Sequence, residues 1–498
     1  MTLPIKKRKG QPLLNKRKTS AIGLGDYIDL QWSVDMKLGS VDVPIVLDTG
    51  SSDLWSISSD CTSSSCGNIT ELSLIKTSEF KTVGLDYRID YRDSSLPTSA
   101  SGAILSGTAR LAGLQLNNQF LGAVNATSTL PGGLTGVFGV GFHTGSNIVG
   151  ALLGQDGVST SNFTDVLNAQ IADQGPFLTR LIANGQLGQP MFTITLQRDT
   201  FDLGGNIGQL TIGKLPEGVS NNSLTWVPVR LYSQEQGGIP SSSNSPNEVS
   251  CLVFFNAKRS PLFWEVPIDE VILNGQTLPK PNLNDSIGYT ALINSGTSTL
   301  HGQQKTVQAL YGALSTDIDN FNSSTRPSYN CTRPIELTYV IGGKQFPVDP
   351  RDIFGFQNLD PRQGDNDGCH IISVGPTNAP STGNLRSWIL GDPFMKSNLV
   401  AFYFGNVTHP SVDPPRIGFL STVPSNASAL FDAVIEVIRQ KGVAGITEVP
   451  PTGTFTASVT NSVGVGQAPK STSDSTNSSN RIEIPSLLFY LLLVMFCL

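Results

Sequence analysis

Two turns in this chain carry the residues whose types could do chemistry. In each, an apolar run ends in an acid or an amide, which is followed by hydroxyl residues around a glycine. The first turn spans Ile45 to Ser52 and contains Asp48, and the second spans Leu292 to Ser298 and contains Asn294. Two carboxylates held close together can hydrolyse a peptide bond without a metal, because one accepts a proton from water while the other donates one. The sequence predicts such a pair with an amide at one position.

The amide changes what the pair can do. Asn294 has nearly the shape of an aspartate and can donate hydrogen bonds to a carbonyl oxygen, but it neither releases nor accepts a proton near neutral pH. A single acid-base participant contributes about 10² to 10⁴-fold to a reaction rate. Hydrolytic turnover is therefore expected to be small or absent, while binding at the pair is preserved.

The surroundings of the two turns are also repeated. An apolar-apolar-glycine triplet follows each turn at nearly the same distance along the chain, Val137 to Gly139 in the first copy and Ile389 to Gly391 in the second. This repetition predicts an internal duplication of one architectural unit. Two such units facing each other would bring Asp48 and Asn294 together across a groove.

The block from Asp48 to Trp55, the second turn and the two triplets resemble the pepsin-like aspartic proteases. The resemblance extends over roughly residues 25 to 422, and the stretches Phe192 to Arg230 and Leu262 to Pro267 are most similar to secreted enzymes of mushroom-forming fungi. It implies an all-β, bilobal acid-protease fold of two pseudo-two-fold-related, barrel-like lobes with the active site in the cleft between them. It further implies a monomer that acts on extended polypeptides in acid and needs no cofactor or metal.

The resemblance also assigns roles residue by residue. Asp48 is the catalytic base, and Asn294 stands at the position of the second catalytic Asp. A tyrosine in a flap over the bound peptide is backed by a tryptophan, and two apolar residues line a substrate pocket. Supporting residues are Thr49, Gly50, Ser51, Ser295, Gly296 and Thr297, the flap pair is Tyr91 and Trp55, and the pocket residues are Leu134 and Val137. Arg92 and Thr135 depart from the usual glycine and aspartate of the family.

Length and composition agree with two lobes. The 498 residues exceed the size of a single hydrophobic core, which stops growing at about 250 to 300 residues. Only 14% of residues are charged, and 50 Gly and 31 Pro favour short strands and many turns. The expected order is a prosegment remnant (1–18), an N-terminal lobe (19–208), a C-terminal lobe (209–425), a short helix and stalk (426–480) and a hydrophobic signal (481–498).

Charge and residue types exclude several other functions. The formal net charge is −6, although seven basic residues lie within the first eighteen, so the body of the chain is acidic. An acidic body argues against nucleic-acid binding, which needs a basic face. The basic run also fits a nuclear address, but the remainder of the chain favours secretion. The four histidines lack metal-ligand spacing, and no nucleophilic serine elbow occurs.

The cysteines and glycosylation sequons favour the secretory route. Two local disulfides are predicted, Cys61 with Cys66 and Cys331 with Cys369, and the resemblance supports both, whereas Cys251 has no evident partner. About ten Asn-x-Ser/Thr sequons occur, at Asn68, Asn125, Asn162, Asn221, Asn284, Asn322, Asn330, Asn406, Asn426 and Asn477.

The two ends give different signals. The apolar run from Leu487 to Leu498 is shorter than the roughly 20 residues that span a bilayer, and it follows a Ser/Thr/Asn tract and a polar spacer. This layout predicts a GPI-attachment signal and a cell-surface protein, with a short tail anchor or an arbitrary terminus as alternatives. Residues 1–18 lack the apolar core of a secretory signal. We expect a truncated N-terminus with a basic prosegment remnant; the alternative is an unexported pseudogene product.

Upstream of the stalk, Leu430, Val434 and Ile438 recur at helical spacing before Gly442, which predicts a short amphipathic helix. Three functions remain open at this point. They are an aspartic endopeptidase with impaired turnover, a catalytically inactive surface protein that binds peptides through the cleft, and a wall-attached structural glycoprotein with a vestigial cleft.

Overall fold

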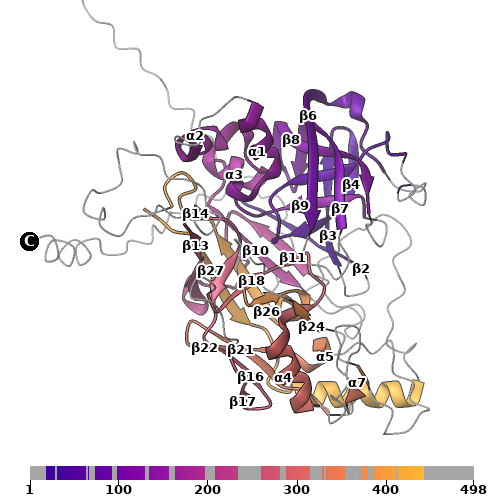
Figure 1. Ribbon diagram of the computed structural model, residues 1–498, viewed down its shortest axis with the longest axis vertical. Coiled ribbons are helices and arrows are strands. Elements are labelled where there is room, and N and C mark those ends of the chain that lie inside the picture. The colour runs from indigo at the N-terminus through magenta and orange to yellow at the C-terminus, as the bar shows by residue number, and fades with distance from the viewer. Residues whose placement is uncertain are drawn as a thin grey trace, which may run out of the picture.

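The computed structural model describes most of the duplicated region and the helix that follows it. The described residues are 18–27, 31–62, 66, 73–91, 98–128, 134–155, 163–196, 208–233, 260–280, 288–314, 328–329, 333–353, 369–370, 373–377, 386–410 and 412–441. Strands dominate these residues and the helices are short and few (Figure 1). The prediction of an all-β, bilobal fold is confirmed.

Eight strands of the first half form one sheet in the order β2-β3-β4-β9-β5-β8-β7-β6. Their bounds are Gly25–Tyr27, Gln31–Leu38, Val41–Asp48, Gly136–Gly139, Leu54–Ile57, Leu114–Thr127, Thr98–Leu111 and Lys81–Tyr91, in that order. Strand β4 is buried from Val43 to its last residue, Asp48, because it is covered on both faces. It runs parallel to β9, which sets Asp48 beside Gly139 of the first triplet.

The second half repeats this arrangement in a five-stranded sheet of order β15-β18-β25-β19-β24. Strand β18 runs parallel to β25 and sets Ile293, next to Asn294, beside Leu390 of the second triplet. The predicted duplication is therefore present in the strand pairing. These strands span Glu265–Pro267, Thr290–Ile293, Trp388–Leu390, Leu300–Gln303 and Val374–Thr377.

Smaller sheets complete the second half. A four-stranded sheet has the order β17-β16-β21-β22, and two ribbons pair β13 with β14 and β20 with β23. The four strands are Gln276–Thr277, Glu270–Leu273, Leu337–Ile341 and Lys344–Val348, and the ribbons are Leu231–Tyr232 with Ser260–Pro261 and Ser328–Tyr329 with Cys369–His370.

A six-stranded sheet joins the halves in the order β1-β11-β10-β26-β27-β12. The first three strands come from the first half and the last three from the second, which places this sheet at the lobe junction, as expected for β11 and β12. The strands are Ser20–Gly23, Gly208–Ile212, Met191–Leu196, Asn398–Tyr403, Arg416–Ser421 and Thr225–Pro228.

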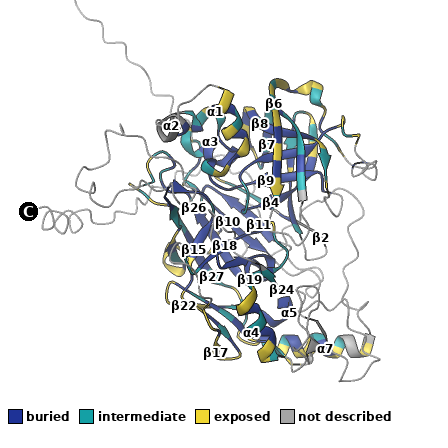
Figure 2. Ribbon diagram, viewed as in Figure 1, coloured by how far each residue is buried: buried dark blue, intermediate teal, exposed yellow. Residues whose placement is uncertain are grey.

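Six of the seven α-helices of the described residues lie at the two ends of the molecule, and the short helix α6 packs on the central strands β10 and β26. Helices α1 to α3 gather beside the eight-stranded sheet, and α4, α5 and α7 lie at the opposite end, with the buried strands between them (Figures 1 and 2). The helices span Asn147–Gln155, Phe163–Gln174, Phe177–Ala183, Gln304–Leu314, Pro350–Ile353, Asp392–Lys396 and Ala427–Lys441.

An aromatic core fills the junction between the halves. Trp264 packs against Phe142 and Phe404 with ring centroids 4.2 and 4.8 Å apart, and Phe192 stacks on Phe402 at 4.7 Å. The indole of Trp264 also donates a hydrogen bond to the carbonyl oxygen of Val140, 3.1 Å away in the first half. Aromatic side chains bury large areas and dominate the energetics of cores and interfaces, so this cluster stabilises the contact between the halves.

The predicted C-terminal amphipathic helix is present as α7, but its buried face differs from the prediction. Phe431 and Ile435 are buried, whereas Leu430 and Val434 are only half-buried. One residue corresponds to about 100° around a helix, so the core-facing stripe lies one position further along than predicted. The helix packs on α5, which places it on the C-terminal half of the fold.

One of the two predicted disulfides falls within the described residues. Cys61 and Cys66 form the predicted disulfide. The second disulfide is not tested, because Cys331 lies outside the described residues and the side chain of Cys369 is not described. Cys251 and Arg92 of the predicted flap turn also lie outside them, and so do the segments 1–17 and 442–498. Among the described helices, none has both the length and the apolar character needed to cross a membrane.

Candidate active site

The first turn holds Asp48 at the carboxyl end of a buried strand. The backbone N–H of Gly50 donates to Asp48 Oδ1 over 2.8 Å, and the Ser51 hydroxyl donates to Oδ2. Both oxygens of the carboxylate therefore accept a hydrogen bond from within the turn. Hydrogen bonds to an ionised acceptor are the stronger kind, and they fix the orientation of the carboxylate.

The second turn holds Asn294 in a matching position after β18. The backbone N–H of Gly296 donates to Asn294 Oδ1 over 2.9 Å, which sets the orientation of the carboxamide because an N–H must face its oxygen. Asn294 Nδ2 then donates to the hydroxyl of Thr297 over 2.7 Å. The amide is therefore hydrogen-bonded to the glycine and to the hydroxyl residue that follow it in the turn, as the carboxylate of Asp48 is in the first turn.

Reciprocal hydrogen bonds connect the two turns. The Thr49 hydroxyl donates to the carbonyl oxygen of Ile293 at 2.7 Å, and the Ser295 hydroxyl donates to that of Leu47 at 2.6 Å. The backbone N–H of Ser295 donates to Thr49 Oγ1 at 3.0 Å, and that of Thr49 donates to Ser295 Oγ at 3.1 Å. These contacts are buried and nearly two-fold symmetric, so they hold the turns in one register.

The glycines of the two turns bring Asp48 and Asn294 face to face. A Cβ atom on Gly50 would lie 2.5 Å from Asn294 Nδ2, and a Cβ atom on Gly296 would collide with Asp48 Oδ1. Each glycine therefore leaves the space that the other turn's side chain occupies. Asp48 and Asn294 are each 6% exposed, so they are shielded yet still reach solvent.

Comparison with known proteins agrees with this geometry. The family model of the eukaryotic aspartyl proteases matches residues 33–409. The chain belongs to this family. It is 22% identical over 385 residues to gastricsin from Mus musculus, covering 76% of this chain and 80% of that protein. It is similarly related to embryonic pepsinogen from Gallus gallus (23% over 380 residues, 74% and 76% covered) and to pepsin A from Rhinolophus ferrumequinum (22% over 386 residues, 77% and 81% covered).

The flap residues predicted for this aspartyl protease lie beside Asp48. The indole N–H of Trp55 donates to the hydroxyl oxygen of Tyr91 over 2.8 Å. Burial, followed by the nearby charge of Asp48, raises the pKa of Tyr91. Tyr91 therefore stays neutral and keeps its proton for hydrogen bonding throughout the range of pH in which a carboxylate titrates.

The predicted pocket residues belong to the apolar cluster behind the flap. Leu134 and Val137 are buried with Trp55, and Tyr91 packs against the same cluster. Val137 lies on β9, where it pairs with Trp55 of β5. The structure thus brings together the two turns, the flap pair and this cluster. Thr135, the position that departs from the family's aspartate, is buried and donates to the carbonyl oxygen of Pro44.

Asp53 is a site residue whose role the sequence did not indicate. Its carboxylate is 2% exposed and accepts hydrogen bonds from the Ser146 hydroxyl and from the backbone N–H groups of Asn147 and Ile148. Burial raises the pKa of Asp53 to about 6, and these hydrogen bonds oppose the rise. Asp53 therefore ties the first turn to the start of α1. The position of Asp53 within the Asp48-to-Trp55 motif indicated that it belongs to the site. Its role became clear only from its hydrogen bonds to the residues at the start of α1.

No cation site accompanies these groups. Within the part of the chain that the structure describes, no group of three or more His, Cys, Asp or Glu side chains is arranged to hold a metal ion.

Proposed function

We propose that this aspartyl protease binds extended polypeptides in the cleft between its lobes and that Asn294 impairs their hydrolysis. The single observation that carries the proposal is the pairing of one carboxylate with one carboxamide across the reciprocal hydrogen bonds of the two turns. The hydrogen bonds that would hold two acidic side chains face to face are present, but only Asp48 of the pair can exchange a proton.

The chemistry divides between the two side chains. Asp48 accepts a proton from a water molecule held between the turns, while the second carboxylic acid of a complete site would protonate the substrate's carbonyl oxygen. The carboxamide of Asn294 has one hydrogen committed to Thr297 and a second that can point toward a carbonyl oxygen. It can therefore polarise the peptide bond without completing the proton transfer.

The binding role is supported by what surrounds the pair. The four hydrogen bonds between Thr49, Ser295 and the opposite strands are all in place, and so is the hydrogen bond from Trp55 to Tyr91. The two turns and the Trp55–Tyr91 pair therefore keep the arrangement in which a peptide would meet both Asp48 and Asn294. These contacts favour a peptide-binding pseudoprotease over a structural glycoprotein with a vestigial cleft.

A binding experiment tests the proposal. The purified full-length chain is titrated with a statine-containing peptide at pH 4, and hydrolysis of denatured globin is followed under the same conditions. We expect tight binding with little or no turnover. Absence of binding would contradict the proposal and favour the structural role, and rapid turnover would show that Asn294 does not limit the reaction.

We further propose that the protein acts outside the cell as a GPI-anchored monomer. This rests on the C-terminal sequence pattern together with the Cys61–Cys66 disulfide, which belongs in an oxidising compartment. A phosphatidylinositol-specific phospholipase C is expected to release the protein from intact cells. Protein that stays cell-bound after this treatment, or that is found only inside the cell, would contradict the anchor.

A further inference from the structure

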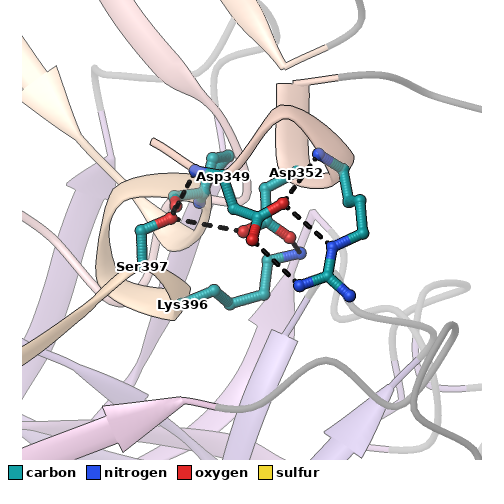
Figure 3. Close-up of polar contacts among 6 residues, drawn as sticks. Asp349, Asp352, Lys396 and Ser397 are labelled. Carbon is teal, nitrogen blue, oxygen red and sulfur yellow. Dashed lines mark hydrogen bonds and ion pairs between the residues drawn. The ribbon is translucent and has the colours of Figure 1, made fainter. Parts of the chain in front are cut away.

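A buried cluster of charges lies where the two short helices α5 and α6 of the second half meet. It consists of Asp349, Arg351 and Asp352 at α5, with Lys396 and Ser397 at the end of α6, and all five residues are buried. Figure 3 shows Asp349 and Asp352 directed toward Lys396 and Ser397. Such groups are expensive to bury unless they are paired, so their presence needs a reason beyond packing.

The contacts inside the cluster join the two helices. Lys396 Nζ lies 3.4 Å from Asp352 Oδ1. The Ser397 hydroxyl lies 2.9 Å from the carbonyl oxygen of Pro393 and 3.3 Å from Asp352 Oδ2, so its single hydrogen is directed mainly to Pro393. The backbone N–H of Asp349 donates to Ser397 Oγ at 2.9 Å. Arg351 donates to both carboxylate oxygens of Asp349, at 3.0 and 2.9 Å. The end of α6 is therefore held to α5 by several polar contacts that depend on direction.

The other end of α6 is fastened to the Asn294 turn. The backbone N–H of Asp392 donates to the carbonyl oxygen of Thr297 at 2.9 Å, and that of Asn294 donates to the carbonyl oxygen of Leu390 at 3.0 Å. A Cβ atom on Gly391 would collide with the Thr297 carbonyl oxygen, so the backbones are in close contact there. Helix α6 has only five residues, about 7 Å of helix, so a shift at Lys396 reaches the turn directly.

Two further contacts extend this chain of support. Lys396 Nζ lies 5.6 Å from the ring centre of Trp32 on β3, which links the cluster to the first lobe. On the outer side, α7 packs on α5, and Phe431 of α7 is 0% exposed within the hydrophobic core. Helix α7 lies beyond residue 409, where the family model ends. The support of this turn therefore includes an element beyond the residues that the family model matches.

We propose that Asp352, Lys396 and Ser397 are positioning residues for Asn294, acting through α6, and that α7 supports them from outside. The geometry of the second turn then depends on the C-terminal helix, although that helix touches neither side chain of the pair. The structural role of these residues does not depend on the proposed function. Their effect on how Asn294 meets a bound peptide does rest on it.

Hydrogen-deuterium exchange of the full-length chain tests the proposal independently of binding or turnover. In Asp352→Asn and Lys396→Met we expect amide exchange in peptides covering Asn294 to Thr297 to accelerate about tenfold or more, because local opening becomes easier. Peptides covering β8 (Leu114–Thr127) are the internal reference, because this strand lies in the first half and is not bonded to the Asn294 turn by the reciprocal hydrogen bonds, and they should change less than about twofold. Lys396→Arg, which keeps the charge, should restore protection.

The matched control is an exposed ion pair of the same type. Lys37 and Asp42 lie 3.0 Å apart on the surface, and Asp42→Asn should leave exchange in both turns unchanged. Phe431→Ala should loosen the Asn294 turn in the same way as Asp352→Asn. Equal acceleration in the Asn294 turn and in β8 would indicate general destabilisation and overturn the positioning role. Unchanged exchange at the Asn294 turn in Asp352→Asn and Lys396→Met would also overturn it.

Binding of the statine-containing peptide adds the functional consequence. We expect its Kd to rise about tenfold or more in Lys396→Met and to return to within about threefold in Lys396→Arg, measured well below the melting temperature. If the unmodified chain fails to bind the peptide, the proposed function falls, and the exchange experiment still decides the positioning role. Full binding by Lys396→Met would contradict the proposed consequence.

Discussion

The Asp48 turn and the Asn294 turn share almost every contact, yet they differ in the direction of one hydrogen bond. At Asp48, both neighbours donate: the N–H of Gly50 to one oxygen and the hydroxyl of Ser51 to the other. At Asn294, the N–H of Gly296 donates, whereas the Thr297 hydroxyl accepts from the amide nitrogen. Either side chain can therefore form the two hydrogen bonds within its turn, because an amide and a carboxylate have nearly the same shape.

This difference separates two properties that are usually lost together. The reciprocal bonds of Thr49 and Ser295 hold the turns in register whether residue 294 is an acid or an amide. Proton transfer, in contrast, needs two groups that titrate. On the function proposed above, an amide at position 294 removes proton transfer at little cost to the fold and leaves a site that can bind peptides.

The largest expected effect comes from exchanging the two members of the pair. In the double variant Asp48→Asn with Asn294→Asp, the single carboxylate stands in the second turn. Turnover should lie about 10² to 10⁴-fold below that of Asn294→Asp alone, because again only one group exchanges protons. Initial rates on denatured globin measure this. Equal rates for the two proteins would mean that Asp48 is not the base.

A second difference between the turns is titratable. Asp53 follows the first turn, whereas Thr299 takes the matching place in the second and contacts His301. The pKa of Asp53 is raised by burial to about 6 from 3.8. The folded state therefore binds more protons than the unfolded state between those values, and this contribution to stability decreases as pH rises from 3.8 to 6.

Replacing Asp53 by asparagine removes this dependence. The free energy of unfolding of Asp53→Asn, minus that of the natural chain, should increase with pH by about 2 kcal/mol between pH 4 and pH 6. His143 has the opposite sign, since burial lowers its pKa to about 4, but it is common to both proteins and cancels. Denaturant unfolding at several pH values gives the difference, and a constant difference would contradict the assigned burial of Asp53.

The two glycines provide a comparison in which both turns should respond alike. In Gly50→Ala and in Gly296→Ala, the added methyl group meets the side chain of the opposite turn. Overpacking of this kind costs about 1 to 3 kcal/mol. Denaturant unfolding measures the cost, and binding of the statine-containing peptide should weaken in both variants. If only one of the two variants lost stability, the two turns would be less symmetric than their hydrogen bonds indicate.

Most of the candidate site could be predicted from the sequence, because the repeated turns and triplets are local patterns. The flap hydrogen bond between Trp55 and Tyr91 also joins residues that the motif and the strand alternation had singled out. The role of Asp53 could not be predicted, because it depends on where α1 begins. The α5 and α6 cluster was missed because Asp352 and Lys396 lie far apart in the sequence and meet only in the fold.

The reciprocal bonds between the turns should give a smaller effect than the glycines. Ser295→Ala removes a donor to Leu47 and an acceptor for Thr49, and Thr49→Val removes the matching pair. Each loss leaves buried backbone groups unpaired, at a cost of about 1 to 2 kcal/mol. Denaturant unfolding should give similar values for the two variants. A much larger cost on one side would mean that one turn supports the other.

The central claim is that a lone carboxylate faces a carboxamide and that this limits hydrolysis. The most direct test compares the natural full-length chain with Asn294→Asp on denatured globin between pH 3 and pH 5. We expect little or no cleavage by the natural chain and an increase of about 10² to 10⁴-fold on restoring the second acid. Equal rates for the two proteins would contradict the claim.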